Sequence, residues 1–243
     1  KMQTALLKKR AELAIYVRDY LTAQHLYHDI LEQRELNWAM LGLAQVNYLQ
    51  GNIDVAIGMF QEIISKYPMT MEAYDLLAQS YELAQQNIEA QETLHQAVKL
   101  SPQTILRQRK LGSIANKTGN LDIAETACKS AVELGKYSVH KHASDFSNLA
   151  QVLTKADKAA DALAIVQTMR DEFPNDPSIS LRAAINENQI YQSTGDTDKA
   201  ETTFAEALKL SEQYDQALDK EVKLDMTQSC YLNGEEDAAQ SLL

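Results

Sequence analysis

Small and large apolar residues recur along the chain at a spacing that fits helices. An alanine is followed four positions later by a large apolar residue, as in Ala56 with Phe60 and Ala90 with Leu94. Side chains four residues apart share one helix face, so each pair indicates an amphipathic helix. The pattern returns at intervals of 33 to 39 residues, which predicts a repeat architecture. The recurring alanines are Ala23, Ala56, Ala90, Ala124, Ala162, Ala200 and Ala239.

Turn residues divide each repeat into two predicted helices. In four repeats a glycine stands five residues before the alanine, and glycine supports a tight turn between helices. Three repeats are closed by a proline, which prevents the second helix from continuing. The turn glycines are Gly51, Gly119, Gly195 and Gly234, and the closing prolines are Pro68, Pro102 and Pro174.

This pattern resembles the tetratricopeptide repeat, a helix–turn–helix unit of about 34 residues. The resemblance is clearest from Met71, where large and small residues stand at the expected positions. The resemblance implies an all-α fold, in which tandem units stack into a right-handed α-solenoid, a superhelix with a concave inner surface. The matching residues of this unit are Tyr74, Leu77, Ala78, Tyr81, Ala90, Leu94, Ala97 and Pro102.

The resemblance covers essentially the whole chain, so one repeat domain is expected over residues 1–243. Its units are predicted to start near residues 4, 37, 71, 105, 143, 181 and 220. The last unit is expected to be truncated, because Leu243 falls in the middle of its second helix. Beyond Ala124 the alanines stand 38 or 39 residues apart instead of 33 or 34, which predicts longer helices or loops in the second half.

Composition and charge narrow the functional classes. The 243 residues contain only 8 glycines and 4 prolines, too few turn residues for an all-β fold. The net charge of −11 argues against nucleic acid as the main partner, because phosphate binding needs clustered Lys and Arg. The sequence contains no apolar stretch long enough for a membrane span, so no membrane insertion is expected.

The sequence carries no recognisable catalytic chemistry. Phosphate-binding glycine loops, the nucleophile elbow and the HExxH zinc motif are all missing from it. Two histidine pairs are expected to be exposed rather than to bind metal, and both cysteines are expected to be buried, reduced thiols. We therefore predict a non-catalytic cytoplasmic protein without cofactor or metal. The residues weighed are His25 with His28, His140 with His142, Cys128 and Cys230.

In the tetratricopeptide family, one side of the first helix of each unit lines the concave groove. Transferred to this chain, that side is apolar and aromatic in the second unit, acidic in the third and basic from the fourth onward. Such a varied surface suits an extended or helical peptide. The candidate groove residues are Trp38, Leu41, Gln45, Tyr48, Gln79, Arg109, Lys110, Ser113, Asn148, Gln151, Arg182, Asn186 and Gln189.

Two alternatives remain open for these residues. Trp38 and Tyr48 would instead pack against the first unit. Arg109, Asn148 and Arg182 partly resemble the carboxylate clamp of chaperone-binding family members, while two other clamp positions depart from it. Arg in place of Lys changes the geometry of such a site. The second alternative is therefore either a true carboxylate clamp or a less specific site for acidic peptides.

Short strings at residues 6–10, 102–112 and 134–139 resemble bacterial response regulators in which a receiver domain precedes tetratricopeptide repeats. This resemblance implies a two-component signalling scaffold whose phosphorylated aspartate lies upstream of Lys1. The leading hypothesis is therefore a protein-interaction module that binds a protein or peptide in its groove. The rivals are a self-associating scaffold, including a homodimer through the terminal repeats, an envelope or pilus assembly protein, and a helical enzyme.

Overall fold

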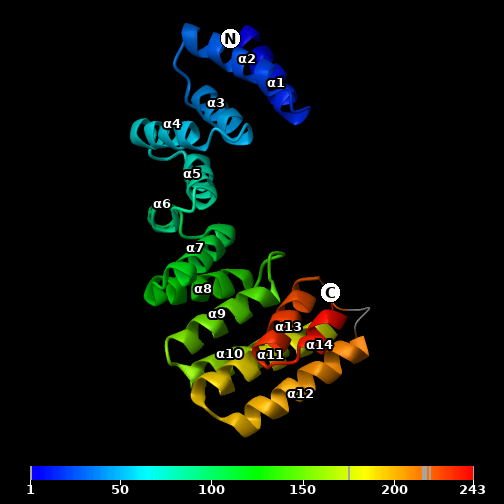
Figure 1. The fold of residues 1–243 in the computed structure, drawn as a ribbon. Helices are drawn as coiled ribbons and strands as arrows, with labels where there is room; N and C mark the ends of the chain where they lie inside the picture. The colour runs from blue at the N-terminus through cyan, green and yellow to red at the C-terminus, as the bar shows by residue number, and fades with distance from the viewer. Residues whose placement is uncertain (1, 175, 215–217, 219, 243) are drawn as a thin grey trace. The chain divides into compact units, whose positions relative to one another are not determined.

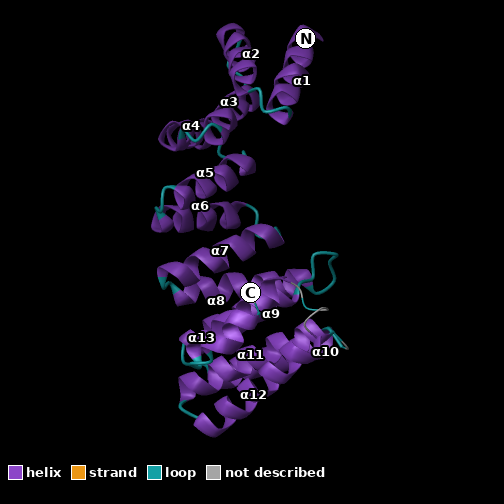
Figure 2. Ribbon diagram, turned by 45° about the vertical axis from the view of Figure 1, so that its right-hand side comes forward, coloured by secondary structure: helices purple, strands orange, loops and turns teal. Residues whose placement is uncertain are grey.

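The computed structural model describes residues 2–174, 176–214, 218 and 220–242, and every regular element among them is an α-helix (Figures 1 and 2). The predicted all-α class is confirmed. The helices of the first half are α1 (Met2–Tyr16), α2 (Tyr20–Gln33), α3 (Asn37–Leu49), α4 (Ile53–Lys66), α5 (Met71–Leu83), α6 (Asn87–Leu100) and α7 (Ile105–Thr118). Those of the second half are α8 (Leu121–Gly135), α9 (Ala143–Lys155), α10 (Ala159–Glu172), α11 (Pro177–Thr194), α12 (Thr197–Tyr214), α13 (Lys220–Leu232) and α14 (Glu236–Ser241).

We call each odd-numbered helix a first helix and each even-numbered helix a second helix. They pack as helix–turn–helix pairs in the first, second, third, fifth, sixth and seventh predicted units. The first helices α3, α5, α7, α9 and α13 begin at the predicted starts of their units. The second helix of the last pair, α14, ends at Ser241, and the described residues end at Leu242. The truncation expected at Leu243 therefore lies outside the described residues.

The sixth pair begins four residues before its predicted start near residue 181. The Asp176 side chain accepts a hydrogen bond from the Ser178 backbone N–H at 2.9 Å and caps the new helix end. Pro177 fits the first turn because no intrahelical partner exists there for a backbone N–H. Helices α11 and α12 each contain 18 residues, against 13 to 15 in α1–α10, which confirms the predicted lengthening.

Contacts divide the chain into two compact units, Lys1–Thr118 and Gly119–Leu243. The first unit contains α1–α7 and the second contains α8–α14. Each unit has its own buried residues and its own cleft, described separately below. The single array expected over residues 1–243 stays a prediction.

The first unit is packed through close approach of small residues to large ones. A Cβ added to Gly42 on α3 would lie 2.3 Å from the ring of Tyr27 on α2, so only glycine fits there. Ala23 and Ala39 are completely buried in the same cluster. Phe60 and Ile63 on α4 are also completely buried. Small residues therefore bring neighbouring helices together, both at a position that the repeat pattern predicted, Ala23, and at two that it did not, Ala39 and Gly42.

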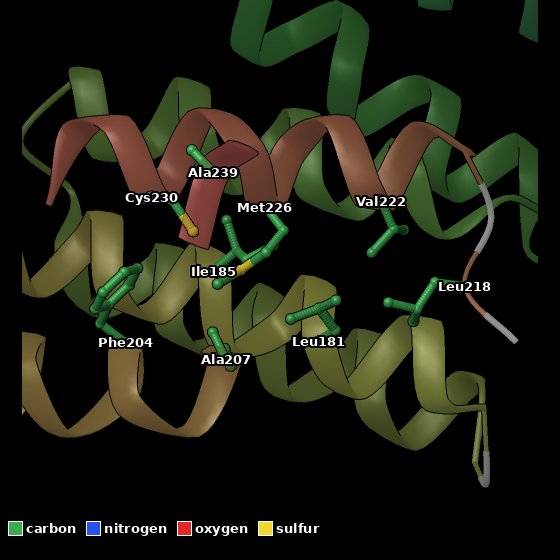
Figure 3. Close-up of a cluster of buried hydrophobic side chains, with 10 residues drawn as sticks. Leu181, Ile185, Phe204, Ala207, Leu218, Val222, Met226, Cys230 and Ala239 are labelled. Carbon is green, nitrogen blue, oxygen red and sulfur yellow. The ribbon is translucent and has the colours of Figure 1, made fainter. Parts of the chain in front are cut away.

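The core of the second unit joins its last four helices. Leu181 and Ile185 on α11 face Phe204 on α12 and Met226 and Cys230 on α13 (Figure 3). Residues from all four helices contribute, and seven of the ten cluster members are fully shielded from solvent. This cluster orders α11 and α13, which carry most of the cleft described next.

The turn after each first helix contains one residue with a left-handed backbone. Glycine takes this position at four of these turns, Gly51, Gly119, Gly195 and Gly234, which confirms the predicted turns. Arg18, Gln85 and Asp157 take it in the other three, at φ near 60°.

Candidate functional site

The first helices of the second unit line one cleft of about 320 Å³. On each helix most lining residues are three, four or seven positions apart, so they share one face. Four predicted groove residues meet here: Gln151, Arg182, Asn186 and Gln189. The full lining is Gln151, Thr154 and Lys155 from α9, Arg182, Ile185, Asn186 and Gln189 from α11, and Asp225 and Gln228 from α13.

Three glutamines define the chemistry of this cleft. Gln151, Gln189 and Gln228 occupy the ninth position of the predicted units that start near residues 143, 181 and 220. Among the described residues, none of these three side-chain amides has a hydrogen-bond partner. Each amide offers two N–H donors and a carbonyl acceptor. The cleft therefore presents three amide groups that are ready to bind a polar ligand.

Arg182 forms one wall of the cleft and is already neutralised. Its side chain is only 7% exposed and contacts Asp225 at 3.0 Å and Glu221 at 3.4 Å. Both carboxylates come from α13, so the pairs join α11 to α13. Arg182 thus lines the predicted groove, but its charge is paired with carboxylates of α13 and serves the contact between helices. In a carboxylate clamp Arg182 would bind the carboxylate of a ligand, but here it binds two carboxylates of the protein itself.

The floor of the cleft is fixed by buried side chains. Asn186 is 3% exposed, and its Nδ2 donates a hydrogen bond to Ser147 Oγ at 2.8 Å. Ser147 is itself buried on α9, and Ile185 is buried beside Asn186. Asn186 was predicted to bind a ligand, but the structure uses its amide to hold α11 against α9. Lys155 is exposed at the rim.

Trp38 packs within the first unit. Its ring meets the Tyr27 ring edge-on at a centroid distance of 6.5 Å, and Lys8 Nζ lies 4.9 Å from the Trp38 ring centroid. Tyr27 and Lys8 belong to the first pair of helices, so the packing alternative is confirmed for Trp38. The other candidates on α3, Leu41, Gln45 and Tyr48, are half-buried.

Asp75, one of the three acidic residues expected in the groove of the third repeat with Glu72 and Glu82, is also paired. Arg107 on α7 donates two hydrogen bonds to Asp75 on α5, at 2.8 Å from Nε and 2.7 Å from Nη2. Gln79 Nε2 donates to the Asp75 backbone carbonyl at 3.0 Å. Reasoning from the sequence missed Arg107, although its opposite charge one repeat after Asp75 was a usable signal.

The remaining candidates lie outside the amide-lined cleft. Lys110 and Ser113 on α7 and Asn148 on α9 are exposed. Arg109 is half-buried and already engaged in an interaction. The structure thus gathers four of the thirteen predicted residues in one place and distributes the others.

The predicted exposure of the histidines and burial of the cysteines are confirmed. His25, His28, His140 and His142 are exposed, and both cysteines are buried. Burial raises the pKa of the Cys128 thiol to about 12, so it is protonated at neutral pH and a poor nucleophile. In the part of the chain that the structure describes, no three potential metal ligands gather. None of the described helices is both long and apolar enough to cross a membrane.

Gln228 is the functional candidate that sequence reasoning missed. The signal was present, because glutamine recurs at the ninth position of five predicted units. A residue type repeated at one structural position predicts a column of identical side chains. The recurring residues are Gln45, Gln79, Gln151, Gln189 and Gln228.

Family models of the tetratricopeptide repeat match residues 38–68, 72–104 and 189–214. The chain thus contains tetratricopeptide repeats, as the sequence pattern implied. No curated protein matches the chain.

Solved structures of the same fold extend this result. A tetratricopeptide repeat protein from Parabacteroides merdae ATCC 43184 is 13% identical, with a TM-score of 0.70 over 100% of this chain and 91% of that one. MamA is 20% identical, with a TM-score of 0.62 over 74% and 94% of the two chains. YrrB, described as a tetratricopeptide-repeat protein with an unusual peptide-binding site, is 14% identical, with a TM-score of 0.60 over 79% and 95%. At these identities the likeness concerns the fold.

Proposed function

We propose that this chain is a non-catalytic protein-interaction module that binds an extended segment of a partner protein in the amide-lined cleft. The observation that carries the proposal is the set of three unpartnered amides of Gln151, Gln189 and Gln228 on successive first helices. An extended peptide exposes backbone N–H and C=O groups at regular intervals, and a glutamine amide complements both. Recognition of the backbone would tolerate many peptide sequences.

The surroundings of the glutamines favour binding without rearrangement. The hydrogen bond from Asn186 to Ser147 and the ion pair between Arg182 and Asp225 fix α9, α11 and α13 to one another. A cleft held in its binding geometry loses little entropy when a ligand enters. The peptide-binding site named for YrrB gives a precedent for the same use of this fold.

The test starts from peptides selected by display on the immobilised wild-type chain. Replacing Gln151, Gln189 and Gln228 together by alanine is expected to weaken the selected peptides at least about tenfold, since each lost hydrogen bond contributes about 0.5–1.5 kcal/mol. Titration calorimetry measures the affinity, and circular dichroism checks that the helices persist. N-methylation of the peptide backbone is expected to produce a similar loss.

Gln167→Ala is the matched control. Gln167 is exposed on α10, and its amide binds Asp171 on the same helix, away from the cleft. Its affinity for the selected peptides is expected to stay within about twofold of wild type. Equal binding by the triple variant and by wild type would remove the cleft from the proposal.

The narrower assignments rest on the sequence alone. We propose the output region of a bacterial response regulator, acting in the cytoplasm, from the strings at residues 6–10, 102–112 and 134–139. Reading the gene upstream of Lys1 tests it, because a receiver domain is expected there. The rival hypothesis is self-association through the terminal repeats. Light scattering over a range of concentrations tests it, and a constant monomer mass would reject it.

A further inference from the structure

A second cleft lies in the first unit, between two second helices. It has a volume of about 300 Å³, with walls from α4 and α6 and a floor from α5. Tyr74, Leu77 and Tyr81 form the floor and are 4–8% exposed. Their spacing of three and four residues puts all three on one face of α5. We name this site the α4/α6 groove; it is separate from the amide-lined cleft.

The walls of the α4/α6 groove leave a small part of the largely buried floor open to a ligand. Ser65 on α4 and Thr93 on α6 are small, so they leave the space between the two helices open. Gln61 Nε2 donates to Tyr81 Oη at 2.7 Å, which fixes the ring of Tyr81 at the base. The floor is therefore a rigid, mainly apolar surface with one oriented tyrosine.

The rim of the α4/α6 groove carries negative charge. Glu89 and Glu92 are exposed on α6 and line the groove, and no basic residue is among its lining residues. Within the described chain, neither carboxylate forms an ion pair. Other carboxylates of this unit do find cations, as Glu62 and Glu35 do with Lys66. The groove thus combines an apolar floor with two available negative charges.

We infer that the α4/α6 groove binds a basic segment of a partner protein through an inserted lysine or arginine side chain. These side chains have an aliphatic stem that packs on apolar surface and a cationic head that stays near water. The stem would lie on Leu77 and Tyr81, where a tyrosine ring also attracts a cation. The head would lie between Glu89 and Glu92. Charge complementarity selects this occupant over an acidic or purely apolar segment.

The proposal is tested with two synthetic helical peptides that differ only in their charged residues. Both are built from alanine and leucine; one carries lysines and the other carries glutamates at the same positions. Titration calorimetry with the full chain is expected to show at least about tenfold tighter binding of the lysine peptide. Equal affinity for the two peptides, or no binding of either, would overturn the proposal.

Two variants locate the binding, each with a matched control. Glu92→Lys is expected to weaken the lysine peptide about tenfold or more, because a like charge then faces the bound cation. Glu32→Lys makes the same change at an exposed position of α2 outside the groove and is expected to change affinity less than about twofold. Equal losses in both variants would mean attraction to the overall negative charge and would reject the groove.

The second variant fills the groove without altering any charge. Ser65→Trp places a large ring between α4 and α6 and is expected to abolish binding of the lysine peptide. Val55→Trp adds the same bulk at a 54% exposed position of α4 that does not line the groove, and is expected to bind as wild type. Retained binding by Ser65→Trp would show that the peptide sits elsewhere.

Discussion

The two units join successive first helices with different chemistry. In the first unit, α5 and α7 meet through one bidentate pair, Asp75 with Arg107, and one hydrogen bond joins Asn37 on α3 to Thr70 at the start of α5. The buried cluster of α1–α3 is apolar. In the second unit, hydrogen bonds and ion pairs recur along the whole length of α11. They are Ser147 with Asn186, Arg182 with Asp225 and Glu221, Asn188 with Asn233, and Gln192 with Asn233.

This difference explains why the amide-lined cleft lies in the second unit. Apolar side chains fill space between helices, because dispersion and burial reward close packing. Polar pairs fix the helices at set points and leave other amides uncovered, as with Gln189 between Asn186 and Gln192. One repeat pattern therefore supports a packed unit and a unit with an open polar face.

The largest expected effect comes from the apolar packing of the first unit. Phe60 is completely buried on α4, so Phe60→Ala removes a large side chain and leaves a cavity. The free energy of unfolding is expected to fall by about 3–5 kcal/mol. Hydrogen exchange is expected to show the loss of protection mainly in α3–α6.

Phe204→Ala is the counterpart in the second unit. Phe204 belongs to the cluster that joins α11 to α13, so protection is expected to fall there instead. Reciprocal patterns would establish that the two units are separate in energy as well as in contacts. A loss spread evenly over α3–α14 in both variants would contradict that division.

The next effect concerns the polar joints of the second unit. Asn186→Ala removes the donor to Ser147 and leaves a buried hydroxyl without it. The free energy of unfolding is expected to fall by about 1–3 kcal/mol, measured by urea denaturation. The cost is smaller than that of Phe60→Ala because the apolar core of the unit is kept.

A double-mutant cycle isolates this hydrogen bond. Ser147→Ala and the double variant complete the cycle, and a coupling of about 1 kcal/mol is expected between the two side chains. Strictly additive losses would show that Asn186 does not stabilise the unit through Ser147.

Most of the fold could be predicted from the sequence, because repeated local signals agree with one another. Each helix pair carries its own small residues, turn and apolar face, so five of the seven first helices begin at their predicted residues. The predicted start of the sixth pair was wrong, because a helix cap formed by Asp176 and Pro177 begins α11 earlier than the repeat spacing indicates. Local capping residues set the N-terminus of α11, and the spacing of the repeat carries no information about such a cap.

The candidate site was less predictable, because position within a repeat shows which face a residue is on but not its partner. Arg182 was correctly placed in the cleft, yet its carboxylates come from α13, about 40 residues later in the chain. Trp38 likewise stands at a groove position and packs on Tyr27. The glutamine column could have been found, since it repeats one residue type at one position.

The smallest expected effect is a pH dependence with opposite signs at two carboxylates of the second unit. Burial raises the pKa of Glu187 above its ordinary value of 4.5, although Arg170 contacts it at 2.8 Å. Lys129 and Lys158 hold the pKa of Glu125 below the same value. Glu187 therefore disfavours the folded state once pH rises above about 4.5, whereas Glu125 stabilises it there and loses this contribution as pH falls.

Urea denaturation of Glu187→Gln and Glu125→Gln between about pH 4 and pH 7 measures both contributions. Relative to wild type, Glu187→Gln is expected to gain stability as pH rises, because glutamine has no charge to desolvate. Glu125→Gln is expected to lose relative stability over the same range, because it gives up two ion pairs that need the carboxylate. Each variant is the control for the other, since both replace one glutamate by its neutral isostere. Differences of the same sign would contradict the assignment of burial as the dominant cause at Glu187.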